Sequence, residues 1–216
     1  MQRLGRGDNE GSLALLRAMK VDRPDDLEIA LFEALALKEL RRYSEAKVAL
    51  ERVLDGTPEF RKPWTSLYYY GWVLMNTGDA DGSRAAFTAF LEFEPTEGDA
   101  YFGLGLLDLE RRDLDGAESN FLKAIEHAES AIRSGKANRA ADWAKCKARL
   151  GEVMFERERF VAARDLLSDS LRLAPQSHEA WYLLHRVYKK LGDAEGAAQA
   201  LARHQATKPP GVPTNP

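Results

Sequence analysis

A twelve-residue interval recurs along this chain and constrains its fold more than any other feature of the sequence. The interval separates five pairs of mostly small residues: Ala34 and Ala46, Gly71 and Ser83, Gly105 and Ala117, Gly151 and Ala163, and His185 and Ala197. In four of the five sets a proline follows after twelve more residues, at Pro58, Pro95, Pro175 and Pro209. Small residues let two backbones approach closely, and proline ends a helix. The pattern therefore predicts repeated pairs of closely packed helices.

The repeat windows give the expected organisation of the chain, because each one contains a helix, a turn, a second helix and a break. We expect five units at residues 27–60, 64–97, 98–137, 138–177 and 178–206, with a half-unit or N-terminal cap at 1–26 and a disordered tail at 207–216. Gly78-Asp79 and Gly192-Asp193 mark two of the turns, since glycine suits a left-handed helix end and aspartate suits the next helix start.

Two parts of the chain depart from the regular spacing. Glu129 replaces the expected proline of the third set, so we expect a lengthened second helix ending at Ser134-Gly135. A lengthened first helix then begins near Asn138. At the front, Ser12 and Pro24 match the second half of a unit whose first helix would need residues before Met1. Either the chain is cut from a longer array, which we favour because an unpaired helix leaves an apolar face uncovered, or it begins with a cap.

Several windows resemble the tetratricopeptide repeat (TPR) signature over nearly the whole chain. The residues that carry this resemblance are Trp181, Leu184, Tyr188, Gly192-Asp193, Ala197 and Pro209, together with Tyr101, Phe102, Gly103, Leu104, Gly105, Ala117, Phe121 and Ala124. The departures are Glu33 in a usually apolar position, Ser83 for alanine, Asp108 for an aromatic residue and His185 for a small one. The resemblance implies an all-α, right-handed superhelical solenoid of helix pairs.

In the TPR family the first helices of successive units line a concave groove that holds a peptide or a helix of another protein. The resemblance places ten candidate partner-binding residues in that groove: Leu31, Leu35, Tyr68, Trp72, Met75, Phe102, Leu106, Leu109, Tyr182 and Arg186. An exposed stripe of such residues is typical of a contact surface, and Trp72 is the best hot-spot candidate. The alternative is that these side chains fill a tightly curved superhelix or meet the lengthened helix near Ile125.

The composition of the candidate groove changes along the chain. Its C-terminal end carries Lys145, Glu152, Arg186 and Lys189 among apolar residues. A partner with an apolar segment followed by acidic residues would suit such a surface, while the alternative for the lysines is an ordinary solvated helix face.

The sequence shows no assembled catalytic, cofactor or metal constellation. The four histidines lack metal-ligand spacing, and Cys146, although it lies between two lysines, has no catalytic companions. The formal net charge of −3 disfavours nucleic acid, and no apolar run is long enough for a transmembrane helix. We therefore expect a non-catalytic, cytoplasmic interaction scaffold within a larger assembly. The alternatives are a self-association module, hence a homo-oligomer, and the repeat region of a longer sensory or enzymatic protein.

Overall fold

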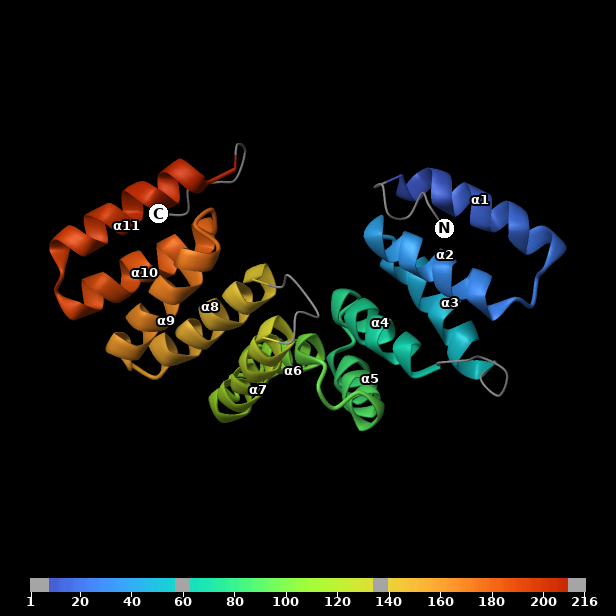
Figure 1. The fold of residues 1–216 in the computed structure, drawn as a ribbon, viewed down its shortest axis with the longest axis horizontal. Helices are drawn as coiled ribbons and strands as arrows, with labels where there is room; N and C mark the ends of the chain where they lie inside the picture. The colour runs from blue at the N-terminus through green and yellow to red at the C-terminus, as the bar shows by residue number, and fades with distance from the viewer. Residues whose placement is uncertain (1–7, 57–62, 134–139, 210–216) are drawn as a thin grey trace. The chain divides into compact units, whose positions relative to one another are not determined.

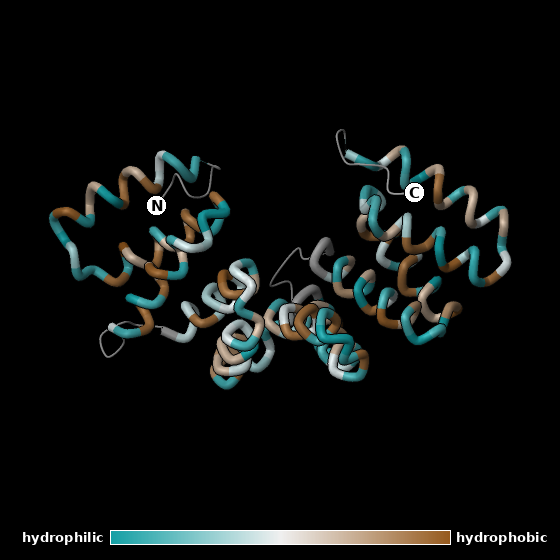
Figure 2. Tube along the Cα trace, turned by 180° about the vertical axis from the view of Figure 1, so that it is seen from behind, coloured by the Kyte–Doolittle hydropathy of each residue, from teal (hydrophilic) through white to brown (hydrophobic). Residues whose placement is uncertain are grey.

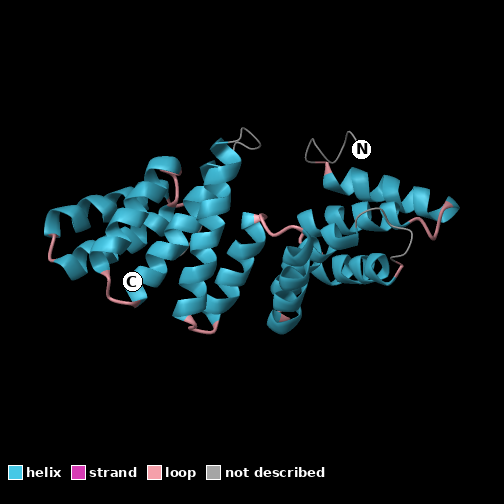
Figure 3. Cartoon of the chain, turned by 60° about the horizontal axis from the view of Figure 1, so that its bottom comes forward, coloured by secondary structure: helices cyan, strands magenta, loops and turns pink. Residues whose placement is uncertain are grey.

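The computed structural model describes residues 8–56, 63–133 and 140–209. Within these ranges the chain forms eleven helices and no strand (Figure 3). They are α1 (Asn9–Asp22), α2 (Leu27–Glu39), α3 (Tyr43–Asp55), α4 (Pro63–Asn76), α5 (Ala80–Phe93), α6 (Gly98–Glu110), α7 (Leu114–Arg133), α8 (Ala140–Glu156), α9 (Phe160–Leu173), α10 (His178–Leu191) and α11 (Ala194–Thr207). The expected all-α array of helix pairs is confirmed.

The chain divides into two compact units, Met1–Thr96 and Glu97–Pro216. In the first unit α2 packs on α3 and α4 on α5, while α1 packs on α2 and α3 on α4 (Figure 1). In the second unit the pairs are α6 with α7, α8 with α9 and α10 with α11, joined by contacts of α7 with α8 and of α9 with α10. Hydrophobic and hydrophilic stretches alternate along the helices (Figure 2), as expected of helices that each bury one side.

The twelve-residue interval is a contact across three of the helix pairs, α4 with α5, α6 with α7 and α10 with α11. The Ser83 hydroxyl donates to the carbonyl oxygen of Gly71 at 2.8 Å. The Asn120 amide likewise donates to the Asp108 carboxylate at 2.7 Å, and His185 Nδ1 lies 2.8 Å from the carbonyl oxygen of Ala197. Residues twelve apart therefore face each other, and a polar departure from the small-residue rule is accommodated when it hydrogen-bonds the opposite helix.

The turn inside each helix pair has the same backbone conformation in all five windows. A residue with positive φ occurs at Arg41, Gly78, Arg112, Glu158 and Gly192, each seven residues after the first member of its twelve-residue pair at 34, 71, 105, 151 or 185. The two glycines have φ of 83° and 75°, which confirms their expected role as left-handed helix ends. The other three turns adopt the same conformation without glycine, at a cost of about 1–2 kcal/mol each. The packing of the repeat thus imposes a left-handed backbone conformation on three residues that do not prefer it.

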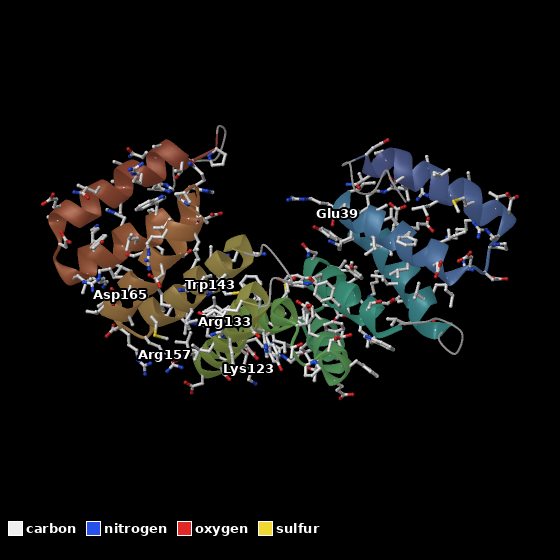
Figure 4. All side chains as sticks on the ribbon, viewed as in Figure 1. Glu39, Lys123, Arg133, Trp143, Arg157 and Asp165 are labelled. Atoms are coloured by element: carbon white, nitrogen blue, oxygen red, sulfur yellow. The ribbon has the colours of Figure 1, made fainter. Side chains whose placement is uncertain are left out.

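The lengthened helices are present in the second unit. Helix α7 has 20 residues and α8 has 17, whereas the other helices have 13 or 14. The expected ends at Ser134-Gly135 and near Asn138 lie outside the described residues, as does most of the expected tail. Arg157, in the turn directly after α8 and labelled in Figure 4, pairs with Asp115 and Glu118 of α7, so charged contacts bridge the end of α8 and the first turns of α7.

Glu33 is a buried carboxylate that departs from the repeat pattern, with 6% of its surface exposed. Its oxygens lie 2.6 Å from Lys20 Nζ and 3.4 Å from Arg17 Nε, both on α1. Glu33, which stands in a usually apolar position of α2, therefore pairs with charged residues of α1, the helix that packs against α2. A buried charge with such partners avoids the large penalty of isolation.

Candidate functional site

The structure places the first-unit candidates on the first helices of two pairs. Leu31 and Leu35 lie on α2, whereas Tyr68, Trp72 and Met75 lie on α4, and all five are half-buried. Leu31 packs against the hydrophobic cluster formed by α1, α2 and α3 with Val73 of α4. The expected stripe is therefore present on these helices, but it is less exposed than the sequence indicated.

An aromatic ladder between α4 and α5 explains part of that burial. The ring of Trp72 meets Phe87 edge-on at 5.3 Å between centroids, and Tyr68 lies 5.4 Å from Phe90. One step further along, the Trp64 ring stacks on Phe93 at 5.4 Å. Trp72 thus contributes to the interior of its own helix pair, and its truncation would disturb packing as well as any contact surface.

A cavity of about 440 Å³ opens on the first helices of the second unit. It is lined from α6, α8 and α10, with a contribution from α9 and the residue preceding α10, and its lining includes four candidates: Phe102, Leu106, Tyr182 and Arg186. Leu109, half-buried on α6, is not among the lining residues. A volume of this size lies within the range of about 300–1,000 Å³ typical of ligand pockets. Three consecutive first helices therefore contribute to one concave surface.

Apolar side chains form much of this cavity. Phe102, Leu106 and Leu183 line it together with Ala148 and Ala180. Phe102 is 7% exposed and packs against Phe121 of α7 at 5.7 Å between ring centroids. The expectation that Phe102 is exposed is therefore wrong. Its ring reaches the cavity wall but belongs to the core of its helix pair.

The charged residues of the cavity are held by aromatic rings and by one another. Lys145 Nζ lies 5.5 Å above the Phe102 ring, and the Arg186 guanidinium lies 4.5 Å from the centre of the Phe155 ring. Each ring belongs to the helix pair that precedes the one carrying its cation. Arg149 pairs with Glu152 of the same helix at 2.7 Å. The result is an apolar floor bordered by cations in fixed positions.

Sequence reasoning missed several lining residues, among them Ala148, Arg149, Leu183 and Glu179. A signal for the α8 residues was available, because Lys145, Ala148, Arg149 and Glu152 follow the spacing of one helix face. Leu183 and Glu179 flank Tyr182 on the wall contributed by α10. Both border the cavity because of how α10 packs against its neighbours, and the repeat pattern does not specify that packing.

Three other titratable groups, His178, His204 and Cys146, take part in packing. His204 Nδ1 lies 2.8 Å from the carbonyl oxygen of His178, and the two rings stack at 5.9 Å. Cys146 is buried at 4% exposure. Across residues 8–56, 63–133 and 140–209, no group of three or more His, Cys, Asp or Glu side chains is arranged to hold a metal ion. None of the helices in those ranges combines the length and apolar character needed to span a bilayer.

Comparison with known families agrees with this architecture. Two family profiles described as tetratricopeptide repeat match the chain, one at residues 32–96 and 70–132 and the other at 154–211. Together they cover most of the sequence. The chain belongs to the tetratricopeptide repeat family. Members of this family mediate protein–protein interactions, and their repeats are typically non-catalytic.

Solved structures share this fold over 79–96% of the chain. BtubC (BKLC) from P. vanneervenii is 16% identical with a TM-score of 0.73, covering 96% of this chain and 92% of its own. YrrB, described as a TPR protein with an unusual peptide-binding site, is 15% identical with a TM-score of 0.64, covering 91% and 93%. MamA is 17% identical with a TM-score of 0.64, covering 79% and 91%. At these identities the likeness establishes the fold alone.

One curated relative is similar in sequence. Protein FlbA of Caulobacter vibrioides is 36% identical over 115 residues, which is 53% of this chain. The aligned region is 18% of the length of FlbA. The similarity thus concerns a repeat segment and leaves the rest of that longer protein without a counterpart in the alignment.

Proposed function

We propose that this TPR protein is a non-catalytic scaffold that holds a peptide or helix of a partner protein against α6, α8 and α10. The observation that carries the proposal is the cavity of about 440 Å³ bordered by these three first helices. The apolar side chains of the cavity exclude water from the bound segment, and its charged side chains orient that segment. The family relationship supports the same class of function.

The first-unit candidates extend the proposal to a second surface. Leu31, Leu35, Tyr68, Trp72 and Met75 are half-buried, so each retains some accessible area. We infer a contact role for this surface from its large apolar side chains, which are enriched at interfaces. Tests on it need variants that shorten the accessible tip of a side chain, because truncation of Trp72 would also remove its contact with Phe87.

A photo-crosslinking experiment tests the proposal at the second-unit cavity. A benzophenone amino acid is placed at Tyr182, whose side chain lines the cavity, and in a matched variant at Leu122, which is half exposed on the second helix α7. Each full-length variant is expressed in cells, irradiated and analysed by mass spectrometry. We expect a partner peptide attached at position 182 and absent at 122, and the synthetic form of that peptide should bind the purified chain.

The outcomes separate the proposal from its rivals. Attachment at position 182 of a peptide from another copy of this chain would favour the self-association module instead. Equal yields of the same partner at positions 182 and 122 would show contact without selectivity for the cavity, and the proposal would be abandoned. Replacing Leu106 of the cavity wall with glutamine should weaken binding of the synthetic peptide, whereas Leu122→Gln should leave it unchanged.

A further inference from the structure

We propose that Arg186 makes the second-unit cavity selective for a peptide in which an acidic side chain accompanies a bulky apolar one. This inference rests on the proposed function and assigns the chemistry of the segment that binds there. In this assignment the guanidinium holds the carboxylate, and the surface of Phe102, Leu106 and Leu183 receives the apolar side chain. The geometry of the cation–aromatic pairs carries the argument.

Arg186 is prepared to receive an anion. Its side chain is exposed, lines the cavity and lies over the Phe155 ring, with 4.5 Å from the guanidinium carbon to the ring centre. Phe155 is only 8% exposed, so the ring is a fixed support. A guanidinium placed over an aromatic ring keeps its N–H donors at the edge of its plane, where a carboxylate can accept two of them.

The other charges of the cavity leave this position cationic. Glu152 pairs with Arg149 at 2.7 Å, and the Glu179 side chain is largely exposed to solvent. Within the described part of the chain, Arg186 contacts no carboxylate. Lys145, near the start of α8, adds a second positive charge beside Phe102. A negatively charged ligand group is therefore complementary to the cavity, and a positively charged one is disfavoured.

The floor of the cavity limits which anion fits. A free inorganic anion would contact Arg186 but leave the apolar surface of Phe102, Leu106 and Leu183 in water. A peptide with an acidic residue and a nearby leucine, isoleucine, phenylalanine or methionine uses both parts of the site. The carboxylate then sets the register of the segment, because it must reach Arg186 while the apolar side chain contacts Phe102, Leu106 and Leu183.

Selection from a random peptide library gives the first test. Twelve-residue peptides fused at both ends to a carrier protein, so that only side-chain carboxylates are available, are selected on the full-length chain. We expect enrichment of aspartate or glutamate within about one helical turn of a large apolar residue. The tightest peptide is then made with a fluorescent label, and its affinity is measured by polarisation. Its partner variant replaces the acidic residue with the matching amide.

The decisive measurement is a double-mutant cycle between the peptide and the protein. Arg186→Gln and the acid-to-amide change should each weaken binding about tenfold, and together they should weaken it little more than either alone, because both remove one charged hydrogen bond. Lys190→Gln, an exposed cation on the same helix outside the cavity lining, is the matched control and should change affinity less than twofold. Arg186→Lys should recover only part of the loss.

The results distinguish this inference from the proposed function. If Leu106→Gln weakens binding but Arg186→Gln does not, the groove is correct and the acidic assignment is wrong. If Arg186→Gln and Lys190→Gln weaken binding equally, general charge attraction explains the effect and the assignment is also wrong. If the library yields no binding peptide, or if Leu106→Gln has no effect on the selected one, both proposals are overturned.

Discussion

The close contact between Gly105 and Phe121 provides the sharpest test of how the repeat packs. A Cβ atom added at Gly105 would lie 2.6 Å from Phe121 Cε1 and 2.7 Å from Cδ1. Carbon atoms prefer a separation of about 3.5–4.0 Å, so the ring or the helix must move by roughly 1 Å. Phe121 is fully buried and also packs against Phe102, which leaves its ring little room.

We expect Gly105→Ala to destabilise the second unit by about 1 kcal/mol. Overpacking of a buried contact costs roughly 1–3 kcal/mol, whereas replacing glycine with alanine inside a helix recovers about 1 kcal/mol. Phe121→Leu should relieve the clash, because leucine occupies the corresponding place in the first repeat: Leu50 lies sixteen residues after Ala34, as Phe121 lies after Gly105. The double variant should therefore be more stable than the sum of the single changes by about 1 kcal/mol.

Urea unfolding followed by far-UV circular dichroism measures these effects on the full-length chain. A repeat array can unfold in more than one step, so midpoints are compared only between variants with the same transition slope. Ala34→Gly is the control for helix propensity and should cost about 1 kcal/mol without relieving any clash. A stabilising Gly105→Ala, or additive effects of Gly105→Ala and Phe121→Leu, would refute the packing argument.

Three further predictions concern charged and titratable groups. Desolvation, reinforced by a hydrogen bond to a glutamate, raises the pKa of Tyr70 to about 12. Its contribution to stability is therefore present below pH 10 and lost between about pH 10 and 12, and Tyr70→Phe should flatten that decline in urea midpoint. A hydrogen bond from Lys147 is the main cause that lowers the pKa of Asp169, so its contribution is present at neutral pH and lost below about pH 4. Asp169→Asn should cost less than about 1 kcal/mol at pH 7 and flatten the acid decline. Glu33→Ala should cost about 1–3 kcal/mol and speed hydrogen exchange in α1, because it removes the buried partner of Lys20.

Each of these predictions has a clear contrary outcome. An alkaline decline identical in the parent and Tyr70→Phe would assign it to other groups. If Asp169→Asn loses stability at low pH just as the parent does, the acid decline belongs to groups other than the Asp169–Lys147 pair. If Glu33→Ala leaves hydrogen exchange in α1 unaltered, the ion pair does not help to hold that helix, and burial of Leu13 and Leu16 accounts for its packing.

The repeat spacing was sufficient to predict the helix pairs, because a twelve-residue interval can bring small residues face to face only when two helices fold back on each other. It also located the two glycine turns. It did not identify Arg41, Arg112 and Glu158 as left-handed turn residues, since these side chains carry no preference for that conformation. Their backbone is set by the packing of the helices on either side.

The candidate binding residues were predicted less completely than the fold. The sequence placed Leu106, Tyr182 and Arg186 on first helices, and they do line the cavity. It could not foresee that Phe102 is held in the core by Phe121, or that Trp72 packs on Phe87. Large apolar side chains look alike in a periodic pattern whether they face a partner or a neighbouring helix.

The sequence by itself determined the repeat, the helix pairs and the family, because these depend on local periodicity and on small residues at a fixed spacing. Only the tertiary structure decided that Glu33 is paired with α1, and that the rings of Phe102 and Phe155 support cations from the following helix pair. The physical reason is that such contacts join residues of different helices, and their distances depend on how each helix rotates and packs against the next. The chemistry of the cavity is therefore a property of the packed array.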